Sequence, residues 1–185
     1  MNIVKGVVEI GSDRFADVGS FVDRLDSIGE THDVTVQAFD ARYVVSRRHL
    51  ERALELADRE RERGAGIVRD RGVEMLLYAA GRRQIDRARE MGVADGRTPR
   101  AVAVAGSGDE RAAGDAVDGL LDSEDTLGDF DEQRVRSFYD LGAAELDALV
   151  DRVDELSERV DRQTRLIESQ RELIEQLVDE LRRGR

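Results

Sequence analysis

Two short segments place a pair of arginines where a helix is expected to begin. One runs from Ser46 to Leu50 (SRRHL) and the other from Ala80 to Ile85 (AGRRQI). The first turn of a helix already carries free N–H groups and the positive end of the helix dipole, so cations there are unfavourable unless an anion lies close. A bound phosphate or carboxylate would turn either pair into an anion-binding site. Arginine pairs arise by chance in a chain where 28 of 29 bases are arginine, so only their shared location at helix starts carries weight.

The other candidates for chemistry give little support to catalysis. The chain has no cysteine and two histidines, which excludes disulfides, thiolate metal sites, cysteine nucleophiles and a three-histidine metal site. His49 could be a base or a ligand, but a structural role beside a Ser46 helix cap is favoured. The segment 106–108 (GSG) follows a strand, as phosphate loops do, yet it lacks the fuller glycine pattern and a lysine. We therefore expect binding rather than catalysis, with no metal and no cofactor.

The charge distribution indicates an anionic partner for the middle of the chain. The 185 residues have a net charge of −12, whereas residues 42–100 carry a net charge of +5. These arginines could instead pair with carboxylates elsewhere in the fold, and composition alone leaves both interpretations open. The acidic, lysine-poor composition favours adaptation to concentrated salt over an ordinary acidic protein rich in arginine codons. No apolar run approaches the length of a membrane span and no signal peptide is apparent, so we expect a cytoplasmic protein.

Hydrophobic patterning predicts an α+β fold in which helices cover a small mixed sheet of about three to four strands. Strands are expected at 2–10, 35–39 and 101–105, the last entered after Pro99. Helices are expected at 13–29, 47–63, 73–80, 82–91, 109–121 and 133–141. The segment 73–80 is apolar enough to be either a buried helix or a strand, and its glutamate, methionine and alanines favour the helix.

The last segment, 143–185, is expected to be separate from the domain at 1–142. Apolar residues from Leu146 to Leu181 recur at alternating steps of three and four, which is a heptad seam. Valine and isoleucine at one core position and leucine at the other favour a long helix in a parallel two-stranded coiled coil. The alternative is one amphipathic helix that folds back on its own domain.

Two blocks of sequence resemble a known family. Residues 37–53 (QAFDARYVVSRRHLERA) and, more specifically, residues 72–88 (GVEMLLYAAGRRQIDRA) are similar to the small kinase-binding subunit of the KEOPS complex, the PRPK-binding protein family. The expected strand near 101–105 and helix near 133–141 also fit the order of elements in that family. The resemblance covers about residues 1–160.

The resemblance implies a protein without enzymatic activity of its own. It implies an archaeal-type subunit that binds and stimulates the small atypical kinase/ATPase of KEOPS, which makes N6-threonylcarbamoyladenosine at position 37 of tRNA. It also implies tRNA binding, chiefly at the 3′ CCA end. The residues of this chain that would contact tRNA are Arg82, Arg83 and Gln84, and then Arg47 and Arg48. Kinase docking is implied for the C-terminal helix, here through Leu146, Leu149, Val153 and Leu156.

Residues 161–185 depart from the shorter end that is usual in the family. They could pair with a second copy of the chain or with another subunit. The alternative function is therefore a coiled-coil adaptor that dimerises through residues 146–181 and binds only proteins. Binding of tRNA distinguishes the first function from the second.

Overall fold

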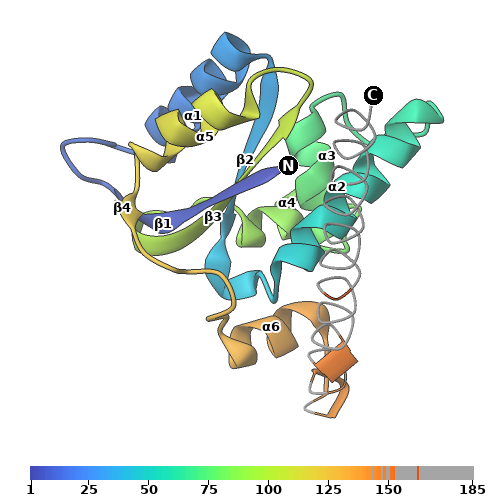
Figure 1. The fold of residues 1–185 in the computed structure, drawn as a ribbon. Helices are drawn as coiled ribbons and strands as arrows, with labels where there is room; N and C mark the ends of the chain where they lie inside the picture. Colours follow the sequence, from blue (N-terminus) through green and yellow to red (C-terminus); the bar gives the residue numbers. More distant parts are fainter. Residues whose placement is uncertain (143, 147, 149–150, 153–161, 163–185) are drawn as a thin grey trace, which may run out of the picture. The chain divides into compact units, whose positions relative to one another are not determined.

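Figure 1 shows the computed structural model, which describes residues 1–142, 144–146, 148, 151–152 and 162. The chain divides after Gly142 into two units, Met1–Gly142 and Ala143–Arg185, and every element named below belongs to the first. Of the predicted heptad seam, only Leu146 is among the described residues. The predicted coiled coil, and the dimeric adaptor that depends on it, thus lie outside the part of the chain that the structure describes.

The described strands form one four-stranded sheet in the order β2-β3-β1-β4. Its members are β1 (Asn2–Ile10), β2 (Val34–Asp40), β3 (Gly96–Gly106) and the two-residue β4 (Asp122–Ser123). Each pairing among them is antiparallel, so the prediction of a mixed sheet was wrong. The connections from β1 to β2 and from β3 to β4 do cross over to a strand of the same direction, but in each case a strand of the opposite direction lies between the two, so all hydrogen-bonded neighbours are antiparallel.

The strand β3 begins earlier than the sequence predicted. Pro99 lies within β3, opposite Val7 of β1, although we expected the strand to start after this proline. Because β2 ends opposite Arg100, Pro99 has a paired strand on one side only. A proline, which lacks an N–H, is tolerated in a strand where one side makes no ladder hydrogen bonds.

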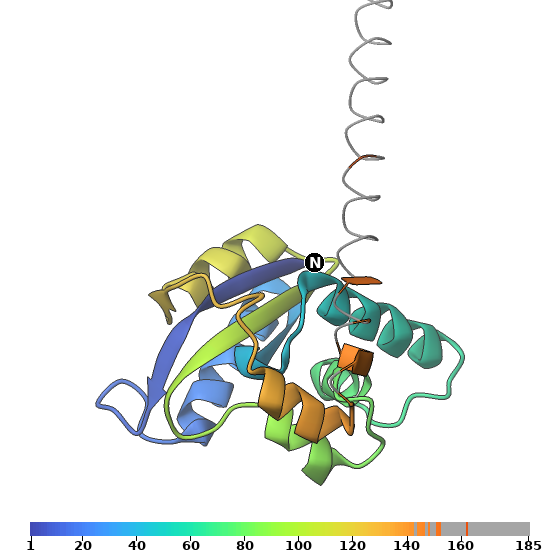
Figure 2. The same ribbon diagram turned by 90° about the horizontal axis from the view of Figure 1, so that it is seen from below.

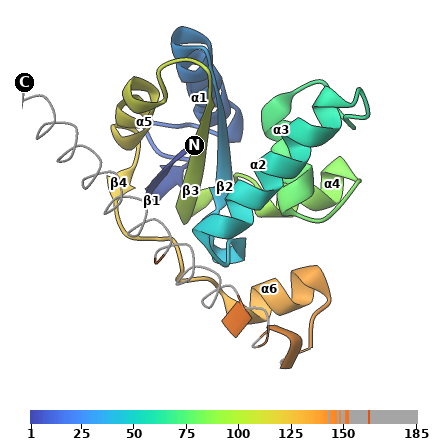
Figure 3. The same ribbon diagram turned by 45° about the vertical axis from the view of Figure 1, so that its right-hand side comes forward.

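Helices cover both faces of the sheet, as Figures 1 and 3 show. On one face lie α1 (Val18–His32) and α5 (Glu110–Asp118), and on the other lie α2 (Arg47–Glu62) and α3 (Arg71–Ala79). Alternation along β2 sends Ala38 into the core under α1 and the next residue, Phe39, into the core under α2 and α3. The expected α+β architecture with helices over a small sheet is confirmed for the first unit.

Local signals explain where most helices begin. Ser46 caps α2 by accepting a hydrogen bond from the His49 N–H, as the sequence predicted. Asp70 caps α3 in the same way, and this apolar segment is a helix rather than a strand. α1 starts at Val18 rather than Asp13, because Asp17 forms a capping box with Ser20.

The predicted helix at 82–91 starts three residues later and is not one continuous α-helix. The chain forms only α4 (Ile85–Ala88) and a 3-10 turn, η2 (Arg89–Met91), after a left-handed turn at Gly81 with φ of 60°. Buried Arg100 fixes the end of this segment, since its Nη1 and Nη2 donate to the carbonyls of Gly92 and Ala94 at 3.1 and 2.9 Å. Burial lowers the pKa of Arg100 to about 10. The segment therefore follows tertiary contacts rather than its helix-forming composition.

Two features are absent from the described residues. None of the helices they form is long and apolar enough to cross a membrane. Nor do His, Asp and Glu side chains in that part of the chain gather into a group of three or more that could hold a metal ion.

Candidate functional site

A cavity of about 650 Å³ opens between η1 (Ala41–Tyr43), the segment before and after α4, and α6 (Glu132–Tyr139). Figure 2 shows α6 in orange next to the green segment that carries α4. We call this cavity the arginine pocket. Its lining includes Arg82, Arg87 and Arg134 and three carboxylate residues, Glu90, Asp131 and Asp140.

Arg82 is fixed against α6 from the neighbouring segment. Its Nη2 donates to the carbonyl of Phe138, and its guanidinium carbon lies 5.6 Å from the centre of the Phe138 ring. The Gly81 turn directs the chain out of α3 so that Arg82 can reach this ring. The contact joins residues 56 positions apart, so it depends on the whole fold.

Arg134 makes a matching arrangement on the other side. Its guanidinium carbon lies 5.4 Å from the centre of the Tyr43 ring, and Nη1 donates to the Tyr43 hydroxyl at 3.2 Å. The Tyr43 and Phe138 rings meet edge to face, with centroids 5.0 Å apart. The pocket wall is therefore an aromatic pair with an arginine over each ring.

The arginines, not the rings, present the surface of this wall. Tyr43 and Phe138 are each only 7% exposed, whereas Arg82 is exposed and Arg134 is partly exposed. A guanidinium plane that rests on a ring can stack a nucleobase on its other face and donate to a phosphate at its edge. The three lining carboxylates balance the three arginines in formal charge, and two of them pair with pocket arginines, Glu90 with Arg87 at 3.4 Å and Asp131 with Arg134 at 3.6 Å. This balance limits non-specific attraction of anions. The geometry thus suits directional contacts to an unpaired nucleotide better than long-range charge attraction.

The three predicted tRNA-binding residues at 82–84 do not all lie in the same site. Arg82 and Gln84 both line the arginine pocket, but Arg83 does not. Arg83 is exposed and makes no ion pair with any residue in the described part of the chain. None of the three lies in the first turn of a helix, because α4 starts at Ile85 and Gln84 is its N-cap. The argument from the helix dipole was therefore wrong for this pair.

Arg47 and Arg48 do lie in the first turn of α2, as predicted, but carboxylates already pair with both. Arg47 contacts Glu51 at 2.8 Å, and Arg48 contacts Glu51 and Glu55 at 3.4 and 3.1 Å. Acids one and two turns further along the same helix thus relieve the conflict with the helix dipole. For Arg47 and Arg48, the basic charge of the segment 42–100 is therefore paired with carboxylates of the same fold rather than left for an anionic partner.

His49 has a structural environment. Its Nε2 lies 2.9 Å from the carbonyl of Ala79, which can only accept, so Nε2 carries the proton. Nδ1 is buried without a hydrogen-bond partner in the described structure. Burial lowers the pKa of His49, against the opposing effect of the bond to Ala79. The preferred structural interpretation of His49 agrees with these contacts.

The Gly-Ser-Gly segment also has a packing explanation. A Cβ at Gly108 would lie 2.0 Å from the carbonyl oxygen of His32 and 2.7 Å from that of Asp33. The N–H of Gly106 already donates to the Glu110 carboxylate at 3.0 Å. Glycine is therefore needed for the close approach of two backbone segments, and a carboxylate occupies one N–H that a phosphate would use.

Sequence reasoning did not find the other half of the arginine pocket. Tyr43 lies inside the first resembling block and Arg134 inside the expected helix at 133–141, but no spacing relates them to Arg82. They meet only because η1 and α6 pack together. Of the four residues proposed for kinase docking, only Leu146 is described, and it is buried, with 2% of its surface exposed. Leu149, Val153 and Leu156 lie outside the described residues.

Comparison with known proteins identifies one family. A family model described as kinase binding protein CGI-121 matches residues 16–178 of the chain. The comparison with curated proteins gave no match to this chain.

Proposed function

The chain belongs to the CGI-121 family of kinase-binding proteins, and from this premise we propose that it is a non-catalytic KEOPS subunit that activates the small kinase/ATPase of the complex and binds tRNA. The tRNA would be the substrate for N6-threonylcarbamoyladenosine formation. In this proposal the chain contributes binding and activation, and its partners carry out the chemistry.

The observation that supports tRNA binding most strongly is the pair of arginines stacked on buried rings in the arginine pocket. The single-stranded CCA end of a tRNA offers both phosphates and unstacked bases. Arg82 makes no ion pair among the described residues and would supply donors for the phosphates, and Arg87 and Arg134 would add theirs by leaving Glu90 and Asp131. Arg82 and Arg134 would also supply planes for base stacking. Gln84, which lines the same pocket, has an amide that can both donate to and accept from a base edge.

Contacts of this kind also suit concentrated salt. At about 1 M salt the Debye length falls to about 3 Å, so long-range attraction between an arginine and a phosphate is nearly lost. Stacking and short bidentate hydrogen bonds act over a few ångströms, so salt weakens them less than it weakens long-range charge attraction. A pocket with balanced charge and arginines held in place by Phe138 and Tyr43 could therefore bind RNA where a diffuse basic patch could not.

For the kinase we propose docking through the segment that carries Leu146, Leu149, Val153 and Leu156. These residues follow the heptad spacing that gives a helix one apolar stripe. An apolar stripe in a chain of net charge −12 is the kind of surface that a protein partner covers.

Activation is tested by measuring ATP turnover. We expect the pure chain to hydrolyse no ATP and to raise hydrolysis by the partner kinase at stoichiometric ratio. The variant Leu149→Asp, with Val153→Asp, should reduce stimulation because placing a carboxylate in an apolar interface costs free energy. Leu146 is left unchanged because it is buried within the chain. Arg83→Gln serves as the control variant, since Arg83 lies outside the pocket and makes no ion pair in the described part of the chain.

Two outcomes contradict the activation proposal. One is ATPase activity that stays with the pure chain through successive purification steps. The other is full stimulation of the kinase by the Leu149→Asp and Val153→Asp double variant, which would place docking elsewhere.

A further inference from the structure

One carboxylate of the arginine pocket lacks a cationic partner. Arg87 pairs with Glu90 at 3.4 Å. Arg134 pairs with Asp131 at 3.6 Å. Asp140 lines the same pocket, and its carboxylate makes neither an ion pair nor a hydrogen bond with the described residues. An unpaired carboxylate is unexpected in a site for RNA, because it repels phosphates. Its presence there indicates a ligand group other than a phosphate.

Asp140 lies at the C-terminal end of α6, next to the contact that fixes Arg82. The Arg82 guanidinium donates to the carbonyl of Phe138, two residues before Asp140. The backbone of Asp140 is left-handed, with φ of 57°, and its N–H donates to the Arg136 carbonyl. Because the C-terminal end of a helix carries partial negative charge, the carboxylate adds charge where an anion is already unfavourable. This end of the pocket thus accepts hydrogen bonds, whereas the stacked arginines donate them.

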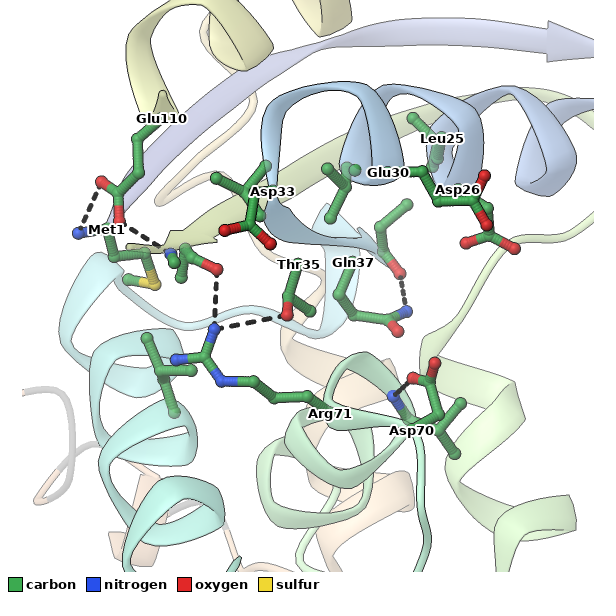
Figure 4. Close-up of a pocket in the computed structure, with 18 of the residues that line it drawn as sticks. Met1, Leu25, Asp26, Glu30, Asp33, Thr35, Gln37, Asp70, Arg71 and Glu110 are labelled. Carbon is green, nitrogen blue, oxygen red and sulfur yellow. Dashed lines mark hydrogen bonds and ion pairs between the residues drawn. The ribbon is translucent and has the colours of Figure 1, made fainter. Parts of the chain in front are cut away.

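The residue type alone identifies nothing in a chain with 41 acids. Asp33 ends α1 in the same left-handed conformation, with φ of 54°, and lines a separate cavity, where Figure 4 labels it. What distinguishes Asp140 is a pocket that also holds two arginines stacked on rings. A ligand that suits both features has a base or phosphate for the arginines and hydrogen-bond donors, away from any phosphate, for the carboxylate.

The last nucleotide of an RNA meets both conditions. Its 3′-oxygen carries no phosphate, whereas the ribose of an internal nucleotide would bring a phosphate to Asp140. Its 2′- and 3′-hydroxyls are adjacent and both can donate, which matches the two oxygens of one carboxylate. Its base can stack on a guanidinium, and its 5′-phosphate can accept from the guanidinium edge. The pocket volume of about 650 Å³ is in the range of small-molecule sites, so it has room for one nucleotide.

We propose that Asp140 selects the free 3′-terminal ribose of the bound RNA by accepting hydrogen bonds from its two hydroxyls. This inference rests on the proposed binding of tRNA and names the group that is recognised. It predicts that a phosphate on the 3′-oxygen weakens binding by repulsion, and that loss of the 2′-hydroxyl weakens binding by removing a donor. The alternative donors to Asp140 are the amino groups of the bases, which would make its effect independent of the sugar.

The test uses the full-length protein and a 5′-fluorescent RNA of about eight nucleotides that ends in CCA. The RNA is made with a free 3′-hydroxyl, with a 3′-phosphate, and with a 2′-deoxy last ribose. We expect the parent to bind the 3′-phosphate form at least about tenfold more weakly than the free end, because like charges then meet. The 2′-deoxy form should bind about three- to tenfold more weakly, the usual effect of one lost hydrogen bond.

Two variants remove the carboxylate without straining the backbone. Glycine and asparagine both suit the left-handed conformation of Asp140, so Asp140→Gly and Asp140→Asn should leave α6 intact, as Tm confirms. Asp140→Gly should bind the three RNAs within about threefold of one another, because both the charge and the acceptors are gone. Asp140→Asn should lose the discrimination against the 3′-phosphate. Asp33→Gly makes a matched change at the end of α1 and should keep the preferences of the parent.

The outcomes separate this inference from the proposed function. If the parent binds an RNA without CCA as tightly as the RNA that ends in CCA, both the proposed function and this inference fail. If binding depends on CCA but is the same for all three forms of the 3′ end, tRNA binding stands and the role of Asp140 is wrong. Equal losses for the three RNAs in Asp140→Gly would place the carboxylate against a base, and a matching change of preference in Asp33→Gly would show that the effect is not local to the pocket. Either result would overturn the proposal.

Discussion

Buried polar side chains secure two irregular segments, one before α3 and one after η2. Glu74 is fully buried, and its two carboxylate oxygens accept from the N–H groups of Ile67 and Val68 at 2.9 and 2.7 Å. Arg100 does the reverse on the other side, where its guanidinium donates to the carbonyls of Gly92 and Ala94. Each side chain replaces the backbone partners that an irregular segment lacks, so each should matter more than any exposed ion pair.

The role of Glu74 can be measured with Glu74→Gln. The amide keeps one acceptor but presents N–H donors toward the second backbone N–H, so one buried donor loses its partner. We expect the free energy of unfolding in urea to fall by about 1–3 kcal/mol. Glu62→Gln, on the exposed end of α2, should stay within about 0.5 kcal/mol of the parent. Identical urea midpoints for the two variants would show that the capping contacts contribute nothing.

His49 should make stability depend on pH. Its pKa is lowered by burial, and a second proton would place an N–H at Nδ1, which has no acceptor among the described residues. The unfolded chain takes up a proton near pH 6.5, above the folded value, so the unfolded state binds more protons as the pH falls. The free energy of unfolding should therefore decrease as the pH is lowered through about 6.5, a range above the ordinary pKa of Asp and Glu.

The control for His49 is the other histidine of the chain. His49→Gln should flatten the dependence of unfolding free energy on pH between about 7.5 and 5.5, whereas His32→Gln should preserve it. Thermal or urea unfolding at several pH values gives the slopes. If the slope of His49→Gln equals that of the parent chain, protonation of His49 is not coupled to folding.

At the scale of the elements, close backbone contact fixes the turn between β3 and α5. Gly108→Ala would place a methyl group within 2.0 Å of the His32 carbonyl oxygen, an atom that cannot move without displacing the end of α1. We expect the free energy of unfolding to fall by about 1–3 kcal/mol. Gly119→Ala meets nothing closer than 3.5 Å and should be nearly neutral. Equal stability of the two variants would leave the segment 106–108 without the packing role assigned to it.

Local sequence signals predicted the elements that local forces determine. β1, β2 and the Ser46 cap of α2 follow from β-branched runs and a capping residue, and the structure confirms them. The segment 82–91 has good helix formers, but the left-handed Gly81 and the contact of Arg82 with Phe138 direct it elsewhere. β4 has only two residues and leaves no periodic signal.

The candidate site was predictable in part for the same reason. The segment Arg82 to Gln84 was predicted as a binding site from its residue types and spacing, and two of its three residues, Arg82 and Gln84, line a pocket. Arg134 and Tyr43, which complete the wall, lie 91 positions apart and meet only in the folded chain. A contact of that range has no signature in a single sequence.

On the scale of the whole molecule, the net charge of −12 opposes compaction. The ion pairs found on the described helices are mostly exposed pairs one turn apart, such as Arg47–Glu51, and each contributes only a few tenths of a kcal/mol. Screening by salt should therefore weaken the repulsion among the excess carboxylates more than it weakens the attraction within these ion pairs. We expect Tm, measured by calorimetry, to rise as the sodium chloride concentration increases from about 0.1 to 1 M. A constant or falling Tm would argue against adaptation to concentrated salt.

The most direct test of the account is the affinity for tRNA with and without its 3′ CCA end, measured in three proteins. They are the parent chain, Arg82→Gln with Arg87→Gln in the arginine pocket, and Arg47→Gln with Arg48→Gln on α2, which removes the same charge. Circular dichroism and Tm confirm that each is folded. We expect the parent to bind intact tRNA at least about tenfold more tightly than the shortened tRNA, a difference that the α2 pair preserves and the pocket pair abolishes. Equal affinity of the parent for both tRNAs, or equal losses in the two variants, would contradict the assignment of the tRNA end to the arginine pocket.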